Sequence, residues 1–380
     1  MKILFFSPYF YPYTSGITTY PQKILSYLSK KNKIEVLTFK YEKKLKTEEI
    51  VGHYKLIRMN HWFKISKGFI SPQSLIYFFK YAKSTDLIIL NQPNFEGLFL
   101  AIFGKIFRKK TISIFHCQVF LSNNFQNKVI SFFLNLSIKI QLNLSNNIIA
   151  YTEDYFNSIP FLRQFKNKTS FILPPIENNL PDKKLLKILL NKKGGNIWIG
   201  YAGRVSSEKG LEYLIDAINI VRRDKALPCL YLIFAGPYGK DVAGENAYYN
   251  KIVLMLKKYK LNYLFLGSFT QQQLSAFYKT IDVLVLPSIN QTEAFGMVQV
   301  EAMLAGTPVI ASNLPGVRIP IKLTKMGILV EPKNVGQIFE AIKIIMKNKD
   351  KYTNEKLIEK AKYIFDIKKV YKFYDKLINL

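Results

Sequence analysis

The sequence predicts an α/β protein of two Rossmann-like domains, each built around an open parallel sheet. The chain has 380 residues with an apolar fraction of 49%, which is enough for two hydrophobic cores. Short apolar runs alternate with longer segments of helical spacing, as in parallel sheets covered by crossover helices. The runs form two sets, separated by a stretch in which proline and glycine interrupt regular structure.

The first set of apolar runs predicts five buried strands in the N-terminal half. They span residues 2–7, 34–39, 87–90, 111–116 and 147–152. The second set predicts six strands in the C-terminal half. They span residues 196–203, 230–236, 263–267, 283–288, 308–312 and 327–330. Because Pro8 and Pro12 interrupt the apolar start of the chain, we expect a first strand there rather than a signal peptide.

The boundary between the predicted domains should fall where FILPPIENNLPD and NKKGGN interrupt the strand pattern. We therefore expect a first domain over residues 1–175, a linker over residues 176–195 and a second domain over residues 196–355. Apolar residues at helical spacing predict C-terminal helices over residues 356–380, which can return to the first domain.

The composition excludes several classes of protein. Two cysteines and three histidines are too few for a disulfide framework or a thiolate metal cluster, so we expect a reducing compartment and no metal. The formal net charge of +29 suggests a polyanionic partner, either nucleic acid or an anionic membrane face. No recognisable nucleic-acid-binding motif accompanies the charge, so we expect no nucleic acid. The abundance of Lys, Ile, Asn and Tyr is typical of an AT-rich coding sequence, which accounts for part of the charge.

The densest chemical signal is TEAFGMVQVEAML, which directly follows a predicted strand. Glu293 should lie at the carboxyl end of that strand, where open parallel sheets bind ligands. Gly296 would let the backbone approach a ligand, and the helix-start amides of Met297 and Val298 suit a phosphate or a sugar hydroxyl. Glu301 should lie on the next turn, about 1.5 Å of rise per residue further in, so both carboxylates can face one ligand. The alternative is a capped amphipathic helix with two solvated carboxylates.

A second signal is GYAGRVSSEKG, which again reads as a strand and a loop before a helix. Arg204 can grip a diphosphate with two parallel hydrogen bonds, and Lys209 adds a compact positive charge. Taken alone, this could be an ordinary basic loop. Both loops leave the same edge of one predicted sheet, however, and their chemistry is complementary.

Together these segments closely resemble the retaining glycosyltransferases of family 4 (group 1), which have the GT-B fold. The resemblance covers essentially the whole chain and is strongest over residues 200–330. It implies two Rossmann-like domains that face each other across a cleft. The first would bind the acceptor and the second the nucleotide-sugar donor.

The resemblance also implies roles for individual residues of the second domain. Glu293 would contact the donor sugar, and Glu301 would hold the ribose hydroxyls. Arg204 and Lys209 would bind the donor diphosphate. The backbone amides expected on sugar and phosphate are those of Phe295, Gly296, Met297 and Val298. The backbone expected against the base is that of Gly267, Ser268 and Phe269.

The first half resembles the family more loosely. Many members carry a paired-glycine loop that approaches the donor phosphates, and here only Gly16 of TSGITTY remains. His116 ends a predicted strand where many members have a histidine facing the reacting sugar, so we expect a catalytic role. A lone histidine is otherwise more often structural. Arg318 stands where many members have an acidic residue, which leaves its role open.

The resemblance implies a hexosyltransferase that retains anomeric configuration and needs neither a metal nor another cofactor. The donor would be a UDP- or GDP-sugar, and the acceptor a lipid-linked sugar or a growing cell-surface polysaccharide of a bacterial envelope. One alternative is a GT-B-like sugar-nucleotide epimerase or phosphorylase. A basic nucleic-acid-binding protein is an alternative of another class.

We expect a cytoplasmic protein that is peripheral on the inner face of the membrane. Aromatic residues and lysines are interleaved over residues 61–69 and 101–110, and an apolar segment follows over residues 129–144. Such mixtures suit an anionic membrane surface. No run approaches ~18 uninterrupted apolar residues, so we expect no spanning helix. The alternative is that these segments are crossover helices whose lysines reflect composition.

Overall fold

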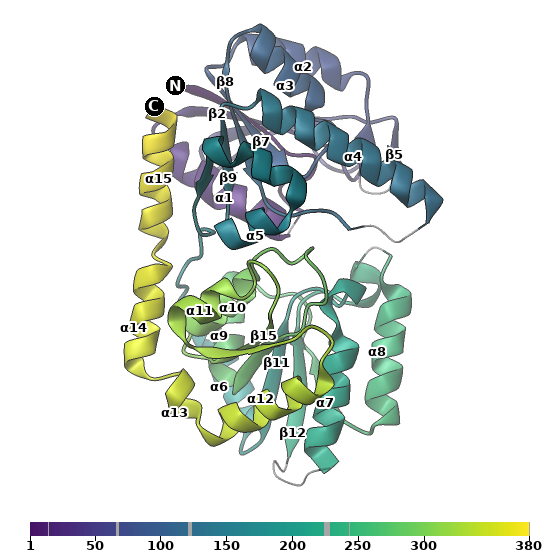
Figure 1. The fold of residues 1–380 in the computed structure, drawn as a ribbon, viewed down its shortest axis with the longest axis vertical. Coiled ribbons are helices and arrows are strands. Elements are labelled where there is room, and N and C mark those ends of the chain that lie inside the picture. The colour runs from purple at the N-terminus through teal and green to yellow at the C-terminus, as the bar shows by residue number, and fades with distance from the viewer. Residues whose placement is uncertain (14, 66–67, 121–123, 224–228, 243, 380) are drawn as a thin grey trace. The chain divides into compact units, whose positions relative to one another are not determined.

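The computed structural model describes residues 1–13, 15–65, 68–120, 124–223, 229–242 and 244–379 (Figure 1). The chain divides into two compact units. Unit 1 consists of Met1–Pro175 together with Ile367–Leu380, and unit 2 consists of Ile176–Asp366.

Unit 1 is built on an eight-stranded sheet with the order β10-β9-β8-β7-β1-β2-β4-β3. All neighbouring strands are parallel except the pair of β3 and β4 at the edge. The strands are β1 (Lys2–Phe6), β2 (Lys33–Phe39), β3 (Glu48–Val51), β4 (Tyr54–Met59), β7 (Leu87–Gln92), β8 (Lys110–Phe115), β9 (Asn147–Ala150) and β10 (Thr169–Phe171). The strand order reverses between β1 and β7, and in such sheets ligands bind beyond the carboxyl ends at this point.

Helices cover this sheet, and its central strands are therefore buried, whereas the edge strands β3 and β10 are not. The helices are α1 (Gly16–Leu28), α2 (Ser74–Lys83), α3 (Leu98–Ile106), α4 (Phe125–Leu144), α5 (Glu153–Ser158), the 3₁₀ segment η1 (Pro160–Lys168) and α15 (Ile367–Asn379). The C-terminal α15 packs on α1, where the hydroxyl groups of Tyr20 and Tyr374 lie 2.8 Å apart and the rings of Tyr27 and Tyr371 stack. A short hairpin of β5 (Phe63–Ile65) and β6 (Gly68–Ile70) forms a separate two-stranded sheet.

Unit 2 is built on a six-stranded, fully parallel sheet with the order β13-β12-β11-β14-β15-β16. The strands are β11 (Ile197–Ala202), β12 (Leu230–Ala235), β13 (Asn262–Phe265), β14 (Val283–Leu286), β15 (Val309–Ser312) and β16 (Gly327–Val330). In order of sequence this is the 3-2-1-4-5-6 arrangement of doubly wound nucleotide-binding sheets. Its switch point lies between β11 and β14.

The helices of unit 2 lie on both faces of its sheet, and the apolar faces of α7 and α12 share one core with β11 and β12. The helices are α6 (Lys183–Lys193), η2 (Ser207–Lys209), α7 (Leu211–Arg223), η3 (Gly239–Asp241), α8 (Asn246–Lys258), α9 (Gln271–Thr280), α10 (Met297–Leu304), α11 (Ile319–Thr324), α12 (Val335–Lys347), α13 (Lys349–Tyr352) and α14 (Glu355–Ile364).

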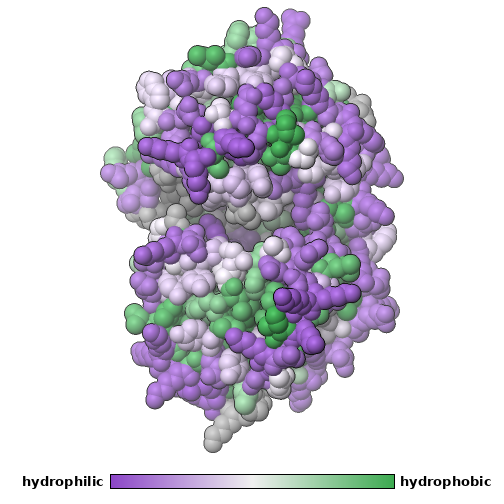
Figure 2. Space-filling model, turned by 180° about the vertical axis from the view of Figure 1, so that it is seen from behind, coloured by the Kyte–Doolittle hydropathy of each residue, from purple (hydrophilic) through white to green (hydrophobic). Residues whose placement is uncertain are grey.

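The predicted fold class is confirmed, since both halves contain parallel sheets covered by helices. All eleven predicted strands coincide with strands of the structure to within two residues at either end. The strands β3, β4, β5, β6 and β10 were not predicted. Within the described ranges, no helix is long and apolar enough to cross a bilayer. Hydrophilic side chains cover most of the face drawn in Figure 2, with smaller apolar areas between them.

Candidate active site

Two loops meet at the switch point of unit 2, one after β11 and one after β14. The backbone N–H of Ile289 donates to the carbonyl of Glu208 at 3.0 Å and joins the two loops. Gly210 makes this approach feasible, because its φ is 61° and a Cβ there would lie 2.6 Å from the carbonyl oxygen of Pro287. The sequence therefore folds so that the residues predicted to bind the donor come from adjacent strand ends.

The contact between the loops is an ion pair of two predicted site residues. Nζ of Lys209 lies 2.5 Å from Oε2 of Glu293, and each side chain is only 16% exposed. Ser288 Oγ also donates to Oε2 of Glu293, at 3.4 Å. The cation expected on the diphosphate and the carboxylate expected on the sugar are thus held together.

Arg204 is paired within its own loop. Its guanidinium donates to Oε1 of Glu208 at 3.0 Å, and its carbonyl accepts the hydroxyl of Tyr201 at 2.6 Å. Burial would raise the pKa of Glu208, but hydrogen bonds and the charges of Arg204 and Lys209 together hold it below its ordinary value. The loop after β11 therefore presents two cations steadied by an ionised carboxylate.

The N-terminus of α10 lies directly beyond this ion pair. Gly296 caps the helix in a left-handed conformation, with φ 73° and ψ 66°. A Cβ on Gly296 would lie 2.5 Å from Cδ2 of Leu286 and 2.9 Å from Nε2 of Gln299. The amides of Met297 and Val298 occupy the first two helical positions, where no carbonyl of the helix can accept them. Such a terminus favours a negative charge.

Gln299 fixes the start of this helix from within the core. Its side chain is fully buried, and Nε2 donates to the carbonyls of Phe295 at 2.6 Å and Val317 at 2.9 Å. The residue after Val317 is Arg318, which caps α11. Phe295 is 2% exposed, so its side chain anchors the loop between β14 and α10 in the core.

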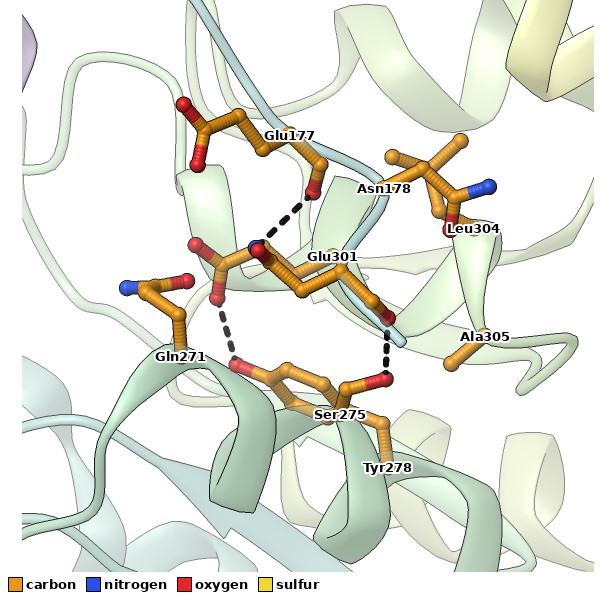
Figure 3. A pocket seen from close by; sticks show the side chains of 9 residues that line it. Glu177, Asn178, Gln271, Ser275, Tyr278, Glu301, Leu304 and Ala305 are labelled. Carbon is orange, nitrogen blue, oxygen red and sulfur yellow. Dashed lines mark hydrogen bonds between the residues drawn. The ribbon is translucent and has the colours of Figure 1, made fainter. Parts of the chain in front are cut away.

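Glu301 lies further along α10 and lines a polar pocket (Figure 3). The hydroxyl of Tyr278 donates to Oε2 of Glu301 at 2.8 Å. The pocket lies within unit 2. Its lining consists of Glu177, Asn178, Asn179, Gln271, Ser275, Tyr278, Glu301, Leu304 and Ala305.

The loop expected against the base follows β13. Gly267 has a φ of 76°, and its carbonyl accepts the backbone N–H of Gly236 at 2.8 Å. The N–H of Gly203 in turn donates to the carbonyl of Ala235 at 2.9 Å. These bonds connect the ends of β11, β12 and β13. Ser268 is exposed and Phe269 is half-buried, immediately before α9.

The two remaining predicted residues belong to unit 1, where both follow the carboxyl ends of strands. Gly16 is exposed and begins α1 after β1, and the N–H of Ser15 donates to Thr18 Oγ1 at 2.9 Å. His116 follows β8 and is only 2% exposed. Gly16 and His116 lie at the carboxyl edge of the first sheet, while the other predicted residues lie at that of the second.

His116 belongs to a buried polar network. Its Nδ1 bonds the hydroxyl of Tyr151, and its Nε2 lies 2.5 Å from Oδ1 of Asn91. Nδ2 of Asn91 donates to Ser7 Oγ at 3.0 Å and to the carbonyl of Ile17 at 3.1 Å. The asparagine oxygen is therefore the acceptor, and Nε2 of His116 carries the proton. Burial lowers the pKa of His116 to about 3, so the imidazole is neutral at physiological pH.

Several residues that shape the site were not predicted from the sequence. Tyr278, Gln299 and Asn91 each bond a predicted residue or the backbone beside one. A polar residue inside the dense EAFGMVQVE segment was a signal for Gln299. Tyr278 follows Phe277 on a mostly polar helix and carries no comparable signal.

Comparison with known proteins finds a family similarity over the second unit. Residues 182–363 match the family described as glycosyl transferases group 1. This segment holds all six strands of unit 2, with both loops and α10. The match therefore falls on unit 2 and leaves unit 1 outside it.

Two curated relatives share part of this sequence. An uncharacterized glycosyltransferase of Methanocaldococcus jannaschii is 37% identical over 144 residues, which cover 36% of this chain and 33% of that protein. The lipopolysaccharide 1,2-N-acetylglucosaminetransferase of Salmonella typhimurium is 33% identical over 164 residues, which cover 43% of this chain and 42% of that protein. The chain thus spans about a third to two fifths of the length of these relatives.

Several solved structures resemble the whole chain. HepE of Anabaena, in complexes with UDP and with UDP-glucose, has a TM-score of 0.77 and 20% sequence identity, with 100% of both chains covered. At this identity the likeness concerns the fold. The chain has the GT-B fold.

Proposed function

We propose that the chain is a retaining glycosyltransferase of family 4. It transfers a hexose-type sugar from a nucleoside diphosphate to a lipid-linked or oligosaccharide acceptor. The observation that carries the proposal is the ion pair of Lys209 and Glu293 beside the first amides of α10. It brings together positive groups for a diphosphate and a carboxylate for sugar hydroxyls, at the switch point of a nucleotide-binding sheet.

The proposed reaction breaks the bond between the anomeric carbon and the phosphate oxygen of the donor. The acceptor hydroxyl oxygen forms its bond to the same carbon on the same face, and its proton passes to the leaving phosphate. Negative charge builds on the diphosphate as it leaves, so Arg204, Lys209 and the α10 amides stabilise the transition state more than the ground state. We propose that these groups act without a metal ion or another cofactor.

The two carboxylates have separate roles in this proposal. Glu293 lies beside Lys209 and accepts hydrogen bonds from the donor sugar, while Glu301 accepts them from the ribose. The base lies against the backbone of Gly267, Ser268 and Phe269, at the end of β13. We propose that Gly16 and His116 of unit 1 contribute to the phosphate and sugar sites. The neutral imidazole of His116 suits hydrogen bonding rather than charge neutralisation.

A UDP- or GDP-sugar is the proposed donor. The group 1 match of unit 2 and the likeness to a protein solved with UDP and UDP-glucose support this choice. The partial likeness to a lipopolysaccharide N-acetylglucosaminetransferase supports a role in cell-envelope glycan synthesis.

We further propose that unit 1 binds an anionic membrane surface that carries the acceptor. Phe125 of α4 is 82% exposed, Phe132 64% and Phe133 61%, and Val129, Leu136 and Ile140 continue the same helical stripe. The opposite side of α4 is buried through Ile138 and Leu142. The helix therefore covers the sheet and also presents an apolar stripe outward. Large exposed apolar patches mark interaction sites.

The positive charge of α2, α3 and α4 favours an anionic membrane as the partner of this apolar stripe. Helices α2, α3 and α4 pack side by side and contain no acidic residue. Their exposed lysines are Lys80, Lys83, Lys105, Lys128 and Lys139. Ile76 and Phe79 on α2 and Phe99 and Ile106 on α3 add exposed apolar side chains. Apolar groups that enter the headgroup region, with lysines worth about 1 kcal/mol each against anionic lipid, suit a peripheral protein.

Product analysis tests the proposed activity. The protein would be incubated with UDP-, GDP- or ADP-glucose and a bacterial lipid extract, and the products identified by mass spectrometry. A glycosylated lipid or oligosaccharide together with free nucleoside diphosphate supports transfer. An epimerised nucleotide sugar, free sugar or a sugar phosphate would instead favour the epimerase or phosphorylase.

A further inference from the structure

We infer that Tyr278 is a positioning residue, which orients the carboxylate of Glu301 toward the ribose and thereby sets the discrimination between ribose and deoxyribose nucleotides. This inference rests on the proposed function of unit 2, and it names a residue and a specificity that the group 1 match does not supply.

Tyr278 is held at both ends. Its side chain is 1% exposed, and its hydroxyl donates to Oε2 of Glu301 at 2.8 Å. Its carbonyl accepts Oγ1 of Thr307 at 2.5 Å, from the turn between α10 and β15. Burial, and then the charge of Glu301, raise the pKa of Tyr278 well above its ordinary value. The hydroxyl therefore keeps its proton and acts as a donor to Glu301.

The pocket around Glu301 has the chemistry of a site for neutral hydroxyl groups. In Figure 3 the side-chain ends of Glu301 and Gln271 lie on the same side of the pocket, and the carboxylate of Glu177 points to that side as well. Two carboxylates would repel a phosphate, whereas they accept hydrogen bonds from a vicinal diol. The cations Arg204 and Lys209 lie on the loop after β11 and do not line this pocket. The pocket thus fits the ribose rather than the diphosphate.

The wall opposite Tyr278 is also fixed. Ser275 Oγ on α9 donates to the carbonyl of Asn179 at 2.7 Å, and Nδ2 of Asn179 donates to the carbonyl of Glu177 at 3.3 Å. The segment before α6 is thereby held against α9. The bond from Tyr278 contributes to the direction of the Glu301 carboxylate between these walls. A carboxylate accommodates about four hydrogen bonds, so this bond leaves capacity for ribose hydroxyls.

The test compares ribose and deoxyribose nucleotides as probes. Calorimetry would measure the affinities of UDP, GDP and their 2′-deoxy counterparts for the wild type, Tyr278→Phe, Glu301→Gln and the double variant. We expect the wild type to prefer the ribose form. Tyr278→Phe should reduce that preference roughly three- to tenfold, because the carboxylate loses its orienting donor. The double variant should add little to Glu301→Gln, since both changes act on one contact.

Tyr259→Phe is the matched control. The hydroxyl of Tyr259 donates to Oδ1 of Asp216 at 2.9 Å, which is the same kind of bond between α7 and the turn after α8. This variant should keep the wild-type ribose preference. A loss of preference in Tyr259→Phe equal to that in Tyr278→Phe would overturn the inference, because the effect would then be general.

The possible results separate the inference from the proposed function. If no nucleoside diphosphate binds the wild type, the proposed function fails. If the nucleotides bind and Glu301→Gln removes the ribose preference while Tyr278→Phe does not, Tyr278 has no positioning role. As a second measurement, 3-fluorotyrosine at position 278 should show a larger ¹⁹F shift with UDP than with 2′-deoxy-UDP. Equal shifts would also contradict the inference.

Discussion

Nζ of Lys209 lies 2.5 Å from Oε2 of Glu293, although the two residues are 84 positions apart in the chain. Each belongs to a different loop at the switch point of unit 2, and each side chain is 16% exposed. Water screens such a pair much less than a surface pair. Changes at either residue should therefore affect both the stability of unit 2 and the binding of the donor.

The first prediction concerns the stability of this pair. Lys209→Ala leaves the Glu293 carboxylate largely buried without its cation, so the free energy of unfolding should fall. In a double-mutant cycle with Glu293→Gln, the coupling energy should be about 1–3 kcal/mol, measured by urea denaturation. The surface pair of Lys362 and Glu359, with Nζ 2.6 Å from Oε1, is the control. Its coupling energy should be at most about a few tenths of a kcal/mol. A coupling near zero for Lys209 and Glu293 would mean that the pair does not hold the loops together.

The second prediction concerns the role of Glu293 in transfer. Glu293→Gln keeps the size of the side chain but removes its negative charge beside Lys209. The affinity for UDP or GDP should stay the same or rise, because the site becomes more positive, whereas turnover should fall strongly. Calorimetry and steady-state kinetics measure the two quantities. If nucleotide affinity falls as much as turnover, Glu293 acts on the nucleotide or the fold rather than on the sugar.

Gly296 supplies the third prediction. Gly296→Ala combines a left-handed backbone with a Cβ placed 2.5 Å from Leu286, so unfolding free energy should fall by about 2–4 kcal/mol. Gly52 also has a positive φ, of 57°, but no atom lies within 4 Å of a Cβ built there. Gly52→Ala should therefore cost only the backbone term of about 1–2 kcal/mol. Equal losses in thermal stability would show that crowding at Gly296 does not matter.

A strand was predictable from the sequence when its residues form a short, mostly apolar run. Nine of the eleven predicted strands are short and buried, so apolar runs reveal them, while β13 and β16 are half-buried. The strand β4 was missed because it contains Arg58, which the sequence suggests should face water. The structure buries Arg58 to 1% exposure, where its guanidinium bonds the carbonyls of Lys46 and Tyr11 and the carboxylate of Glu49. Only these tertiary contacts make a charged residue acceptable inside the sheet.

The site residues that were predictable are those that come after the end of a predicted strand. Glu293, Lys209 and Gly296 follow strands directly, so their approach at one sheet edge follows from topology. Tyr278 was not predictable, because a tyrosine that follows a phenylalanine on a helix shows no sign of a polar partner. Its partner Glu301 comes from another helix, and no local pattern encodes that contact.

His116 supplies the fourth prediction, which concerns pH. Burial lowers its pKa to about 3 in the folded chain, against an ordinary value of about 6.5 in the unfolded chain. Between these values only the unfolded chain binds the proton. The contribution of His116 to stability is therefore complete above pH ~6.5 and is lost as the pH falls toward 3, by up to about 1.4 kcal/mol per pH unit.

Urea denaturation at pH 7.5 and 5.5 measures this effect. The loss of stability between the two pH values should be smaller in His116→Gln than in the wild type. His53→Gln is the control, because His53 is exposed and should leave the difference unchanged. The same His116 variant should lose turnover per folded molecule if His116 also serves the sugar site. Retained turnover would limit His116 to the buried network with Asn91.

The fifth prediction concerns the apolar stripe of α4. Replacing Phe132 and Phe133 by Ser should reduce sedimentation of the protein with anionic liposomes. A second variant changes Lys105, Lys128 and Lys139 together to Gln, and its remaining binding to the liposomes should be less sensitive to salt. Within residues 61–69 and 101–110, Lys64 and Lys110 donate to the carbonyls of Tyr41 and Leu377, and Lys67 lies outside the described residues. Hydrolysis of the soluble donor should change little. Protein that stays in the supernatant with anionic vesicles at low salt would favour a soluble acceptor.

The most direct test of the central claim is calorimetric titration of UDP, GDP and ADP into the wild type and into a variant with both Arg204→Ala and Lys209→Ala. At least one nucleoside diphosphate should bind the wild type. Loss of two charge-assisted contacts, each worth roughly 1.5–3 kcal/mol, should weaken that binding by about two orders of magnitude or more. If none of the three binds the wild type, or if the double variant binds as tightly, the switch point of unit 2 is not a donor site.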